Sequence, residues 1–330
     1  MNIALALGLS QLLVGTASCR PYPHTLNFAV AQLSPRRTCA TILTPSLIET
    51  VEPLRSNKQV ISAEQIGRVR KFRIAHTILG RNLYYTAAYL VDGLMVDTGC
   101  AHTAKELTQS LDGSHVHLIA NTHSHEDHIG GNAALQSAFN AQILAHRDAL
   151  PYLADPRLRR LHPYQRVLWG LPAASEGQAL GSQLETEYFR FEVIHTPGHS
   201  PDHVCLYEPM QGWLFTGDAY VGGSDKALRR DYNIWQIIDS LKKLARLGAQ
   251  VLFTGSGTVR YNPKETLRTK IDYLEEKGER VLELRAGGLS HRRISRQLFG
   301  PEMAIAYYTL RHFSGRNLVR SYIEDKEVPL

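Results

Sequence analysis

The segment 121–131, NTHSHEDHIGG, concentrates side chains that bind metal ions. Three histidines, a glutamate and an aspartate fall between His123 and His128, and two glycines close the segment. Imidazole and carboxylate groups are common protein ligands of zinc and related ions. Successive side chains of an extended segment alternate between two faces, so His123 and His125 point to the same side. The pattern therefore predicts that these two imidazoles bind one metal ion.

Two further ligand-type residues, Asp127 and His128, follow where the chain turns toward the next predicted helix. The change of direction points this pair toward a second location near the first. Gly130 and Gly131 have no side chain, which lets the backbone pack closely beneath the pair. We therefore expect a second metal position beside the first.

Buried strands and flanking helices must position these ligands. Apolar residues 116–120 predict a strand that ends directly before the cluster. A helix-rich insert is expected at 147–171. Because the remaining strands form two blocks, each followed by helices, we expect two sheets packed together with helices outside. The other predicted core elements are strands at 72–79, 84–91, 94–97, 141–145, 188–195, 203–208, 213–216 and 251–254, and helices at 103–111, 132–139 and 234–247.

Four short motifs in this order resemble the metallo-β-lactamase superfamily. They are VDTG at 96–99, the HxHxDH pattern at 123–128, TPGHS at 196–200 and FTGD at 215–218. The resemblance covers about residues 72–262 and implies an αββα metallo-β-lactamase sandwich, with the metal site at the edge of the two sheets. By position it implies His123, His125 and His199 as ligands of the first metal, Asp127 and His128 as ligands of the second, and Asp218 as the bridge.

One ligand of the family pattern is missing. Members with two metals usually carry a histidine in a Gly-His-Gly turn after the last core strand, whereas this chain has Gly255-Ser256-Gly257. A neutral hydroxyl is a poorer ligand than an imidazole. We therefore expect one firmly bound zinc ion and a second site that is weakened by Ser256, or completed by water or another side chain.

Several residues near these motifs have supporting or structural interpretations. Asp97, in a tight turn, is expected to hold ligands in place through hydrogen bonds, and His203 to orient a ligand or line the pocket. His146 and His195 are expected to be structural. Cys100 is expected to be a buried, inert thiol.

The first functional hypothesis is a metal-dependent hydrolase. Zinc lowers the pKa of bound water to about 7, which makes hydroxide available, and polarises the scissile group. Asp127 and Asp218 would position the hydroxide, and Asp127 would also transfer a proton. The run 197–203 resembles glyoxalase II-like thioesterases and a β-lactamase-like endoribonuclease branch. The bond cleaved would then be a thioester, an ester or lactone, or a phosphodiester.

Three alternatives remain open from the sequence. Persulfide dioxygenases resemble this fold and use a single iron ion, which His125 or His123 could hold here with His199 and Asp218. An RNA-processing nuclease of the same fold is a second alternative, although the nearly balanced charge of the core disfavours it. The third is a non-catalytic binding module.

Composition is that of a globular chain that can bury a sizeable core, since the 330 residues are 43% hydrophobic and 21% charged. We expect an N-terminal extension over 1–71, either targeting or disordered, and a metallo-β-lactamase-like catalytic domain over 72–262. A helical, winged-helix-like region is expected over 263–330. In that last region the pattern predicts helices that end at Gly287, begin after Ser290, and span 302–313 and 316–324.

The net charge of +6 comes from the two ends of the chain, and the region around the cluster is nearly balanced. Such a distribution creates no broad positive electrostatic field that would attract a polyanion, and it favours a small-molecule substrate. Lys226, Arg229 and Arg230, in the loop after Asp218, could hold an anionic tail of that substrate or be solvated.

The four cysteines, Cys19, Cys39, Cys100 and Cys205, are widely separated and contain no CxxC pair, which favours a reduced compartment. No apolar run approaches the roughly 18 residues that span a bilayer. A cytoplasmic location is therefore favoured. The first 48 residues contain no acidic residue, and they leave an organelle-targeted or exported form open.

Overall fold

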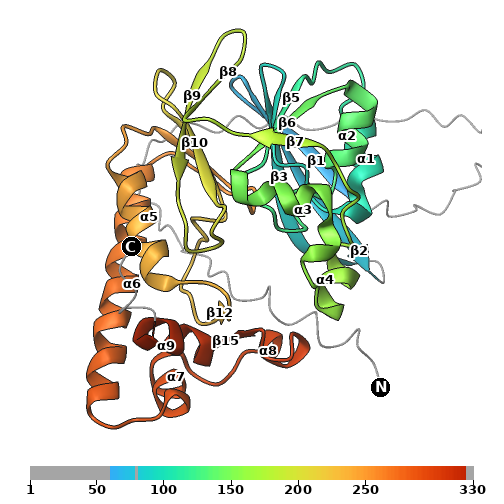
Figure 1. The fold of residues 1–330 in the computed structure, drawn as a ribbon. Helices are drawn as coiled ribbons and strands as arrows, with labels where there is room; N and C mark the ends of the chain where they lie inside the picture. The colour runs from blue at the N-terminus through green and yellow to red at the C-terminus, as the bar shows by residue number, and fades with distance from the viewer. Residues whose placement is uncertain (1–59, 79–80, 325–330) are drawn as a thin grey trace, which may run out of the picture.

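A computed structural model describes residues 60–78 and 81–324 of the chain. Within these residues the core strands form a seven-stranded sheet, ordered β1-β2-β3-β4-β5-β6-β7, and a six-stranded sheet, ordered β14-β13-β11-β10-β9-β8 (Figure 1). The first sheet contains β1 (Ile61–Ile66), β2 (Val69–Ile78), β3 (Arg81–Val91), β4 (Leu94–Val96), β5 (Leu118–Ala120), β6 (Gln142–Ala145) and β7 (Gly177–Ala179). The second contains β8 (Gln183–Glu185), β9 (Arg190–His195), β10 (Val204–Glu208), β11 (Trp213–Gly217), β13 (Val251–Thr254) and β14 (Val259–Arg260).

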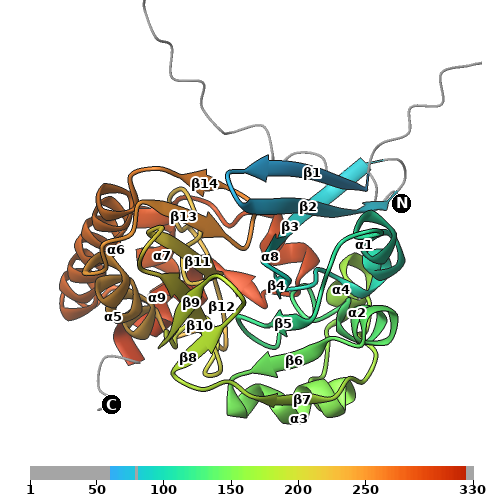
Figure 2. The ribbon, with the colours of Figure 1, turned by 90° about the horizontal axis from the view of Figure 1, so that it is seen from above.

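Helices cover the outer face of each sheet, so the molecule has four layers (Figure 2). α1 (Ala104–Ser110) and α2 (Asn132–Phe139) cover the first sheet, and α5 (Ile234–Ala245) and α6 (Pro263–Ala286) cover the second. The insert between β6 and β7 contains α3 (Leu150–Ala154) and α4 (Pro163–Leu168). Short 3-10 turns lie at Ala101–Thr103, Arg147–Ala149 and Pro156–Leu158. The expected αββα sandwich is confirmed.

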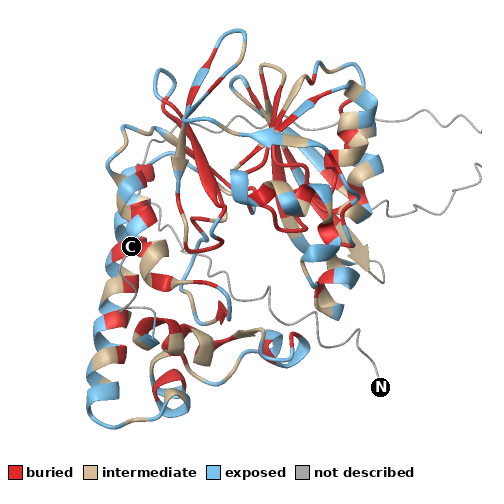
Figure 3. Cartoon of the chain, in the orientation of Figure 1, coloured by how far each residue is buried: buried red, intermediate tan, exposed pale blue. Residues whose placement is uncertain are grey.

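The central layer of the core is aromatic. Phe215 of β11 and Phe253 of β13 stack with ring centroids 4.8 Å apart, and the Tyr89 ring meets both edge-on at 5.4 Å. The Tyr89 hydroxyl donates to the Thr254 carbonyl at 2.5 Å, which satisfies its only polar group inside the sandwich. Figure 3 shows the buried residues concentrated between the sheets and on the inner sides of the helices. These contacts fix the two sheets relative to each other.

The first sheet begins earlier than the sequence predicts. β1 and the start of β2 lie within the segment 60–71, which was expected to belong to the N-terminal extension. β1 lacks an alternating apolar pattern because its four middle residues are exposed, and it is held by antiparallel pairing from Ile61↔Ile74 to Ile66↔Val69. The expected tail or targeting segment, with Cys19 and Cys39, lies outside the described residues.

The C-terminal region contains α7 (His291–Phe299), α8 (Ala304–Tyr308), β15 (Phe313–Ser314) and α9 (Gly315–Glu324). α8 is shorter than the predicted helix 302–313, and Ser290 begins α7 without a side-chain hydrogen bond to it. β15 pairs with β12 (Leu228–Arg229), which lies between β11 and β13 in the chain. The predicted domain boundary at residue 263 stays a prediction. The C-terminal region shares one apolar cluster with α5 and the second sheet. No helix of the described part is long and apolar enough to cross a membrane.

Candidate metal centre

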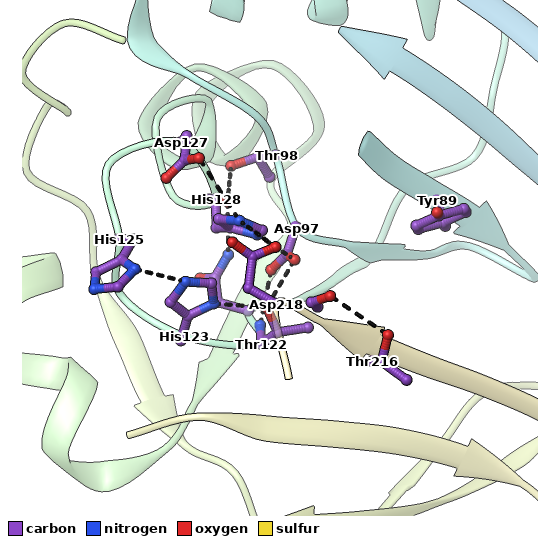
Figure 4. A network of polar contacts seen from close by, with 12 residues as sticks. Tyr89, Asp97, Thr98, Thr122, His123, His125, Asp127, His128, Thr216 and Asp218 are labelled. Carbon is purple, nitrogen blue, oxygen red and sulfur yellow. Dashed lines mark hydrogen bonds and ion pairs between the residues drawn. The ribbon is translucent and has the colours of Figure 1, made fainter. Parts of the chain in front are cut away.

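The ligand-type residues come together where strands of both sheets end (Figure 4). β5 runs parallel to β4 and ends directly before the loop that carries His123 and His125. β11 runs parallel to β13 and ends directly before Asp218. His199 lies in the connection between β9 and β10. Each sheet therefore contributes ligands to one place at its edge.

Three histidines form the first group. His123 Nε2 and His199 Nε2 each lie 2.9 Å from His125 Nδ1, and the three rings are buried. Burial lowers the pKa of all three imidazoles, and that of His199 falls to about 3. The rings are therefore neutral near pH 7, and their ligand atoms lie within 4.8 Å of one another. Such a donor set fits a metal ion, because a cation at the common point satisfies lone pairs that otherwise face each other.

The tautomer of His123 follows from its neighbours. The Thr122 hydroxyl donates to Asp97 Oδ2 at 2.8 Å, so its oxygen accepts from His123 Nδ1 at 3.0 Å. The proton of His123 is therefore on Nδ1, and Nε2 presents a lone pair to the other two histidines. Such a partner on the second ring nitrogen is the usual way in which proteins orient a metal-binding imidazole.

The second group contains His123, His128 and Asp218. His128 Nε2 is buried without a hydrogen-bond partner, 3.6 Å from Asp218 Oδ1 and 3.9 Å from Asp127 Oδ2. Asp218 Oδ2 also lies 3.6 Å from His199 Nε2. Asp218 of the second group thus also lies next to the first group, while Asp127 lies farther out (Figure 4). The bridging role of Asp218 stays a prediction.

Protonation differs between the two groups. Burial alone would lower the pKa of His128, but Asp97, Asp218 and Asp127 outweigh it and raise that pKa well above its usual value. Burial would likewise raise the pKa of Asp218, yet the nearby positive charge of His128 holds it well below its usual range. For Asp127 the charge of His128 offsets only part of the effect of burial, and burial raises the pKa of Asp127 to about 7. In the metal-free protein the second group therefore holds a proton on His128.

Asp97 holds the second group in place. Its backbone φ of 59° lies in the left-handed region, which directs the carboxylate into the loop. The carboxylate accepts from the Thr122 amide at 2.8 Å and from His128 Nδ1 at 2.8 Å. It therefore orients His128 and the start of the metal-binding loop at once.

His203 supports Asp218 and offers no free ring nitrogen. Its Nε2 accepts from the Asp218 amide at 3.2 Å, and its Nδ1 lies 2.9 Å from the Thr196 hydroxyl. Burial lowers its pKa to about 4, so the ring is neutral and its one proton is on Nδ1. Both ring nitrogens of His203 are thus engaged in hydrogen bonds. Its expected role in orienting a ligand stays a prediction.

Glycines allow the close approach of backbone around the site. A Cβ atom at Gly130 would lie 2.2 Å from the Ala101 amide nitrogen. A Cβ atom at Gly255 would lie 2.1 Å from Asp218 Oδ1. The neighbouring Ser256 is exposed, and its hydroxyl lies 3.0 Å from Thr254 Oγ1 and 3.3 Å from Thr258 Oγ1. The structure therefore does not bring the Ser256 hydroxyl into the second group.

The other candidates lie outside the two groups. Of the three basic residues after Asp218, Lys226 and Arg230 are exposed, and Arg229 is buried and paired with Asp231 at 3.2 Å. His146 and His195 stack on each other at 4.8 Å, apart from the metal ligands. Cys100 and Cys205 are buried free thiols, and burial raises the pKa of both.

The insert contributes two residues that the sequence did not indicate. Arg159 donates to Ser124 Oγ at 2.7 Å, and Gln165 donates to Glu126 Oε1 at 2.6 Å. Both acceptors lie inside the HxHxDH loop, between its ligands. No motif marks Arg159 or Gln165, because their role depends on how the insert folds back over the loop.

Comparison with known proteins agrees with this geometry. Residues 81–256, more than half of the chain, match the Metallo-beta-lactamase superfamily, and the chain belongs to this family. It is accordingly a hydrolase-class enzyme, and family membership implies a divalent metal at the site described above.

Among its relatives is a hydroxyacylglutathione hydrolase from Pelagibacter ubique, 28% identical over 192 residues, which are 54% of this chain and 72% of the relative. An atrochrysone carboxyl ACP thioesterase from Aspergillus fumigatus is 26% identical over 57% of this chain and 55% of its own length. The chain thus spans about half of that thioesterase. A metallo-beta-lactamase family protein from Thermus thermophilus shares the fold, with a TM-score of 0.59 and 21% identity over 79% of this chain and 93% of that protein.

Proposed function

We propose that the chain hydrolyses a thioester, or a related ester or lactone, of a small molecule. The observation that carries the proposal is the group of three neutral, buried histidines with an ionised Asp218 beside it. Relatives named as a hydroxyacylglutathione hydrolase and an ACP thioesterase support an acyl group attached to sulfur.

In this proposal the residues divide into ligands and proton carriers. His123, His125 and His199 would hold one zinc ion, and His128, Asp127 and Asp218 would hold a second, weaker one. A bound zinc ion supplies a water molecule of lowered pKa and polarises the acyl oxygen. Asp127, 3.9 Å from His128 Nε2, would accept a proton and return it during the reaction. Asp97 and His203 keep His128 and Asp218 in position.

A mononuclear iron oxygenase is the second candidate. Its support is the turn at Ser256, where a hydroxyl directed toward Thr254 stands in place of an imidazole. A site that holds one metal well and a second one poorly suits a single iron ion bound by two histidines and a carboxylate. Here these would be His125 or His123, with His199 and Asp218.

Metal analysis of the purified full-length chain, followed by assays on defined acyl compounds, tests the proposal. We expect zinc and turnover of S-lactoylglutathione, acetyl-coenzyme A or an N-acyl homoserine lactone. His199 is the only first-group ligand that the second sheet contributes. His199→Ala should therefore abolish tight zinc binding and activity, while the fold persists. Stacked His195→Ala is the matched control and should keep both. Bound iron with oxygen-dependent turnover, or full activity in His199→Ala, would contradict the proposal.

A further inference from the structure

Tyr232 lies in the wall of the histidine group but belongs to none of the family motifs. It follows β12 and precedes α5, and only 7% of its surface is exposed. Its ring packs on His199 with centroids 4.3 Å apart and stacks parallel to His125 at 6.0 Å. Its hydroxyl lies 3.2 Å from His199 Nε2. The side chain therefore touches two of the three residues assigned to the first metal.

The hydroxyl of Tyr232 contacts a ring nitrogen, His199 Nε2, that the first metal ion would also bind. It lies within hydrogen-bond distance of His199 Nε2, the nitrogen that also faces His125. If that lone pair binds a metal ion, the hydroxyl loses its acceptor. A buried donor without an acceptor is unfavourable, so a replacement acceptor is favoured. That acceptor would lie beside His199, within hydrogen-bond reach of the Tyr232 hydroxyl.

A tyrosine hydroxyl is a hydrogen-bond donor near pH 7, because a phenol ionises only at about pH 10. Tyr232 therefore offers the site a donor and not a base.

The C-terminal region holds Tyr232 in this position. β15 pairs with β12 in the register Arg229↔Phe313, directly before Tyr232. The Phe313 ring meets the Tyr232 ring edge-on at 6.3 Å, and the Arg229 guanidinium lies over it at 5.1 Å. A ring held on several sides has little freedom, so its hydroxyl is already oriented before substrate binds.

We propose that Tyr232 is a further catalytic residue, whose hydroxyl donates a hydrogen bond to the acyl oxygen of the substrate. This inference rests on the proposed acyl hydrolysis. The acyl oxygen gains negative charge when water adds to the carbonyl carbon, and a fixed donor stabilises that charge more than it stabilises the neutral carbonyl. The residue therefore acts on the rate of the chemical step and little on substrate binding.

The test compares Tyr232→Phe with the matched control Tyr322→Phe in zinc-loaded, full-length protein. Tyr322 is also buried, and its hydroxyl donates to the Leu274 carbonyl at 2.8 Å within the C-terminal core. The readouts are zinc content, kcat and KM on S-lactoylglutathione or the best acyl substrate found, and the Kd of phenylphosphonate by calorimetry. Phenylphosphonate is a tetrahedral oxyanion and probes the donor without turnover.

We expect Tyr232→Phe to keep its zinc, to lose about 10²-fold in kcat with KM little changed, and to bind phenylphosphonate roughly 10-fold more weakly. Tyr322→Phe should change neither value. Unchanged kcat and phosphonate affinity in Tyr232→Phe, or loss of its zinc, would overturn the proposal. If wild-type protein hydrolyses none of the acyl compounds, the proposed function fails, and phosphonate affinity alone still decides whether Tyr232 is a donor in the site.

Discussion

At the scale of residues, the two ligand groups differ most in the protonation state of their histidines. The first group consists of imidazoles that burial keeps neutral, so it is ready to bind a metal ion at neutral pH. In the second group the carboxylates around His128 keep its ring protonated. A metal ion must displace that proton before it binds there.

Metal occupancy should therefore depend on pH in two stages. The pKa of His128 is raised, so lowering the pH favours its protonated form and opposes binding of the second ion. The pKa of His199 is lowered to about 3, so the first group keeps its lone pairs in mild acid. Equilibrium dialysis against zinc between about pH 8 and pH 5 should show loss of the second ion first. Loss of both ions together, or of the first one earlier, would contradict these protonation states.

Restoring an imidazole at position 256 tests the weakness of the second site. Ser256 is exposed and follows Gly255, where an added Cβ atom would lie 2.1 Å from Asp218 Oδ1 and 3.0 Å from His128 Cε1. A histidine side chain is longer than the serine hydroxyl and can turn toward the second group. We expect Ser256→His to raise second-site zinc affinity by about 10-fold or more, measured by competition with a chelator. Thr258→His, in the same turn, controls for an added histidine. Two equal, tight zinc sites in the wild type would refute this account.

At the scale of elements, the insert fixes the conformation of the metal-binding loop. α4 supplies Gln165, which bonds to buried Glu126, and the preceding turn leads to Arg159, which bonds to Ser124. Asp202 accepts from the Ser124 amide at 2.8 Å on the opposite side. The loop is therefore held from both sheets and from the insert.

Removing one of these contacts should disturb both stability and the metal site. Gln165→Ala leaves the buried Glu126 carboxylate without its donor, so the free energy of unfolding should fall by about 1–3 kcal/mol in urea titrations. Zinc content should fall with it, because Glu126 lies between His125 and Asp127. Gln136→Ala, which removes contacts to the Glu176 backbone at the surface, should change stability by less than about 0.5 kcal/mol. Equal behaviour of the two variants would show that the insert does not hold the loop.

At the scale of the whole molecule, the C-terminal region is part of the core. Leu241 and Leu244 of α5 pack in one cluster with Leu267 of α6 and with Leu318 and Tyr322 of α9. The Trp235 indole donates to the Tyr322 carbonyl at 3.1 Å. Removal of this region would expose an apolar face of the second sheet's helix layer.

A chain truncated after residue 262 should therefore lose its cooperative fold and its zinc. Circular dichroism during thermal unfolding and metal analysis check this expectation. A truncated chain with a sharp transition and full turnover would show instead that the region is an independent domain.

The same region tests the nuclease alternative. We expect little salt-sensitive affinity of the intact chain for a single-stranded RNA, measured by fluorescence anisotropy. Tight binding that falls steeply with salt, and that disappears when exposed Arg292, Arg293 and Arg296 of α7 are changed to glutamate, would favour RNA as the substrate.

Much of the fold could be predicted because its strands are buried and apolar. β5, β10, β11 and β13 are short apolar runs next to motif residues, and local sequence indicates them directly. β1 could not be predicted, since its exposed residues carry no alternation and its pairing with β2 defines it. The two-residue strands β12 and β15 lie far apart in the sequence, and only the folded chain brings them together in the register Arg229↔Phe313.

The sequence by itself determined the ligand types and the family, because His123, His125, Asp127 and His128 stand within six positions and their spacing alone directs them to neighbouring points. Only the tertiary structure decided what surrounds them. Asp97, His203 and Tyr232 reach the ligands through contacts between distant segments, and the protonation of His128 depends on three carboxylates gathered in a buried place. Spacing encodes local direction, whereas burial and charge depend on what packs from elsewhere in the chain.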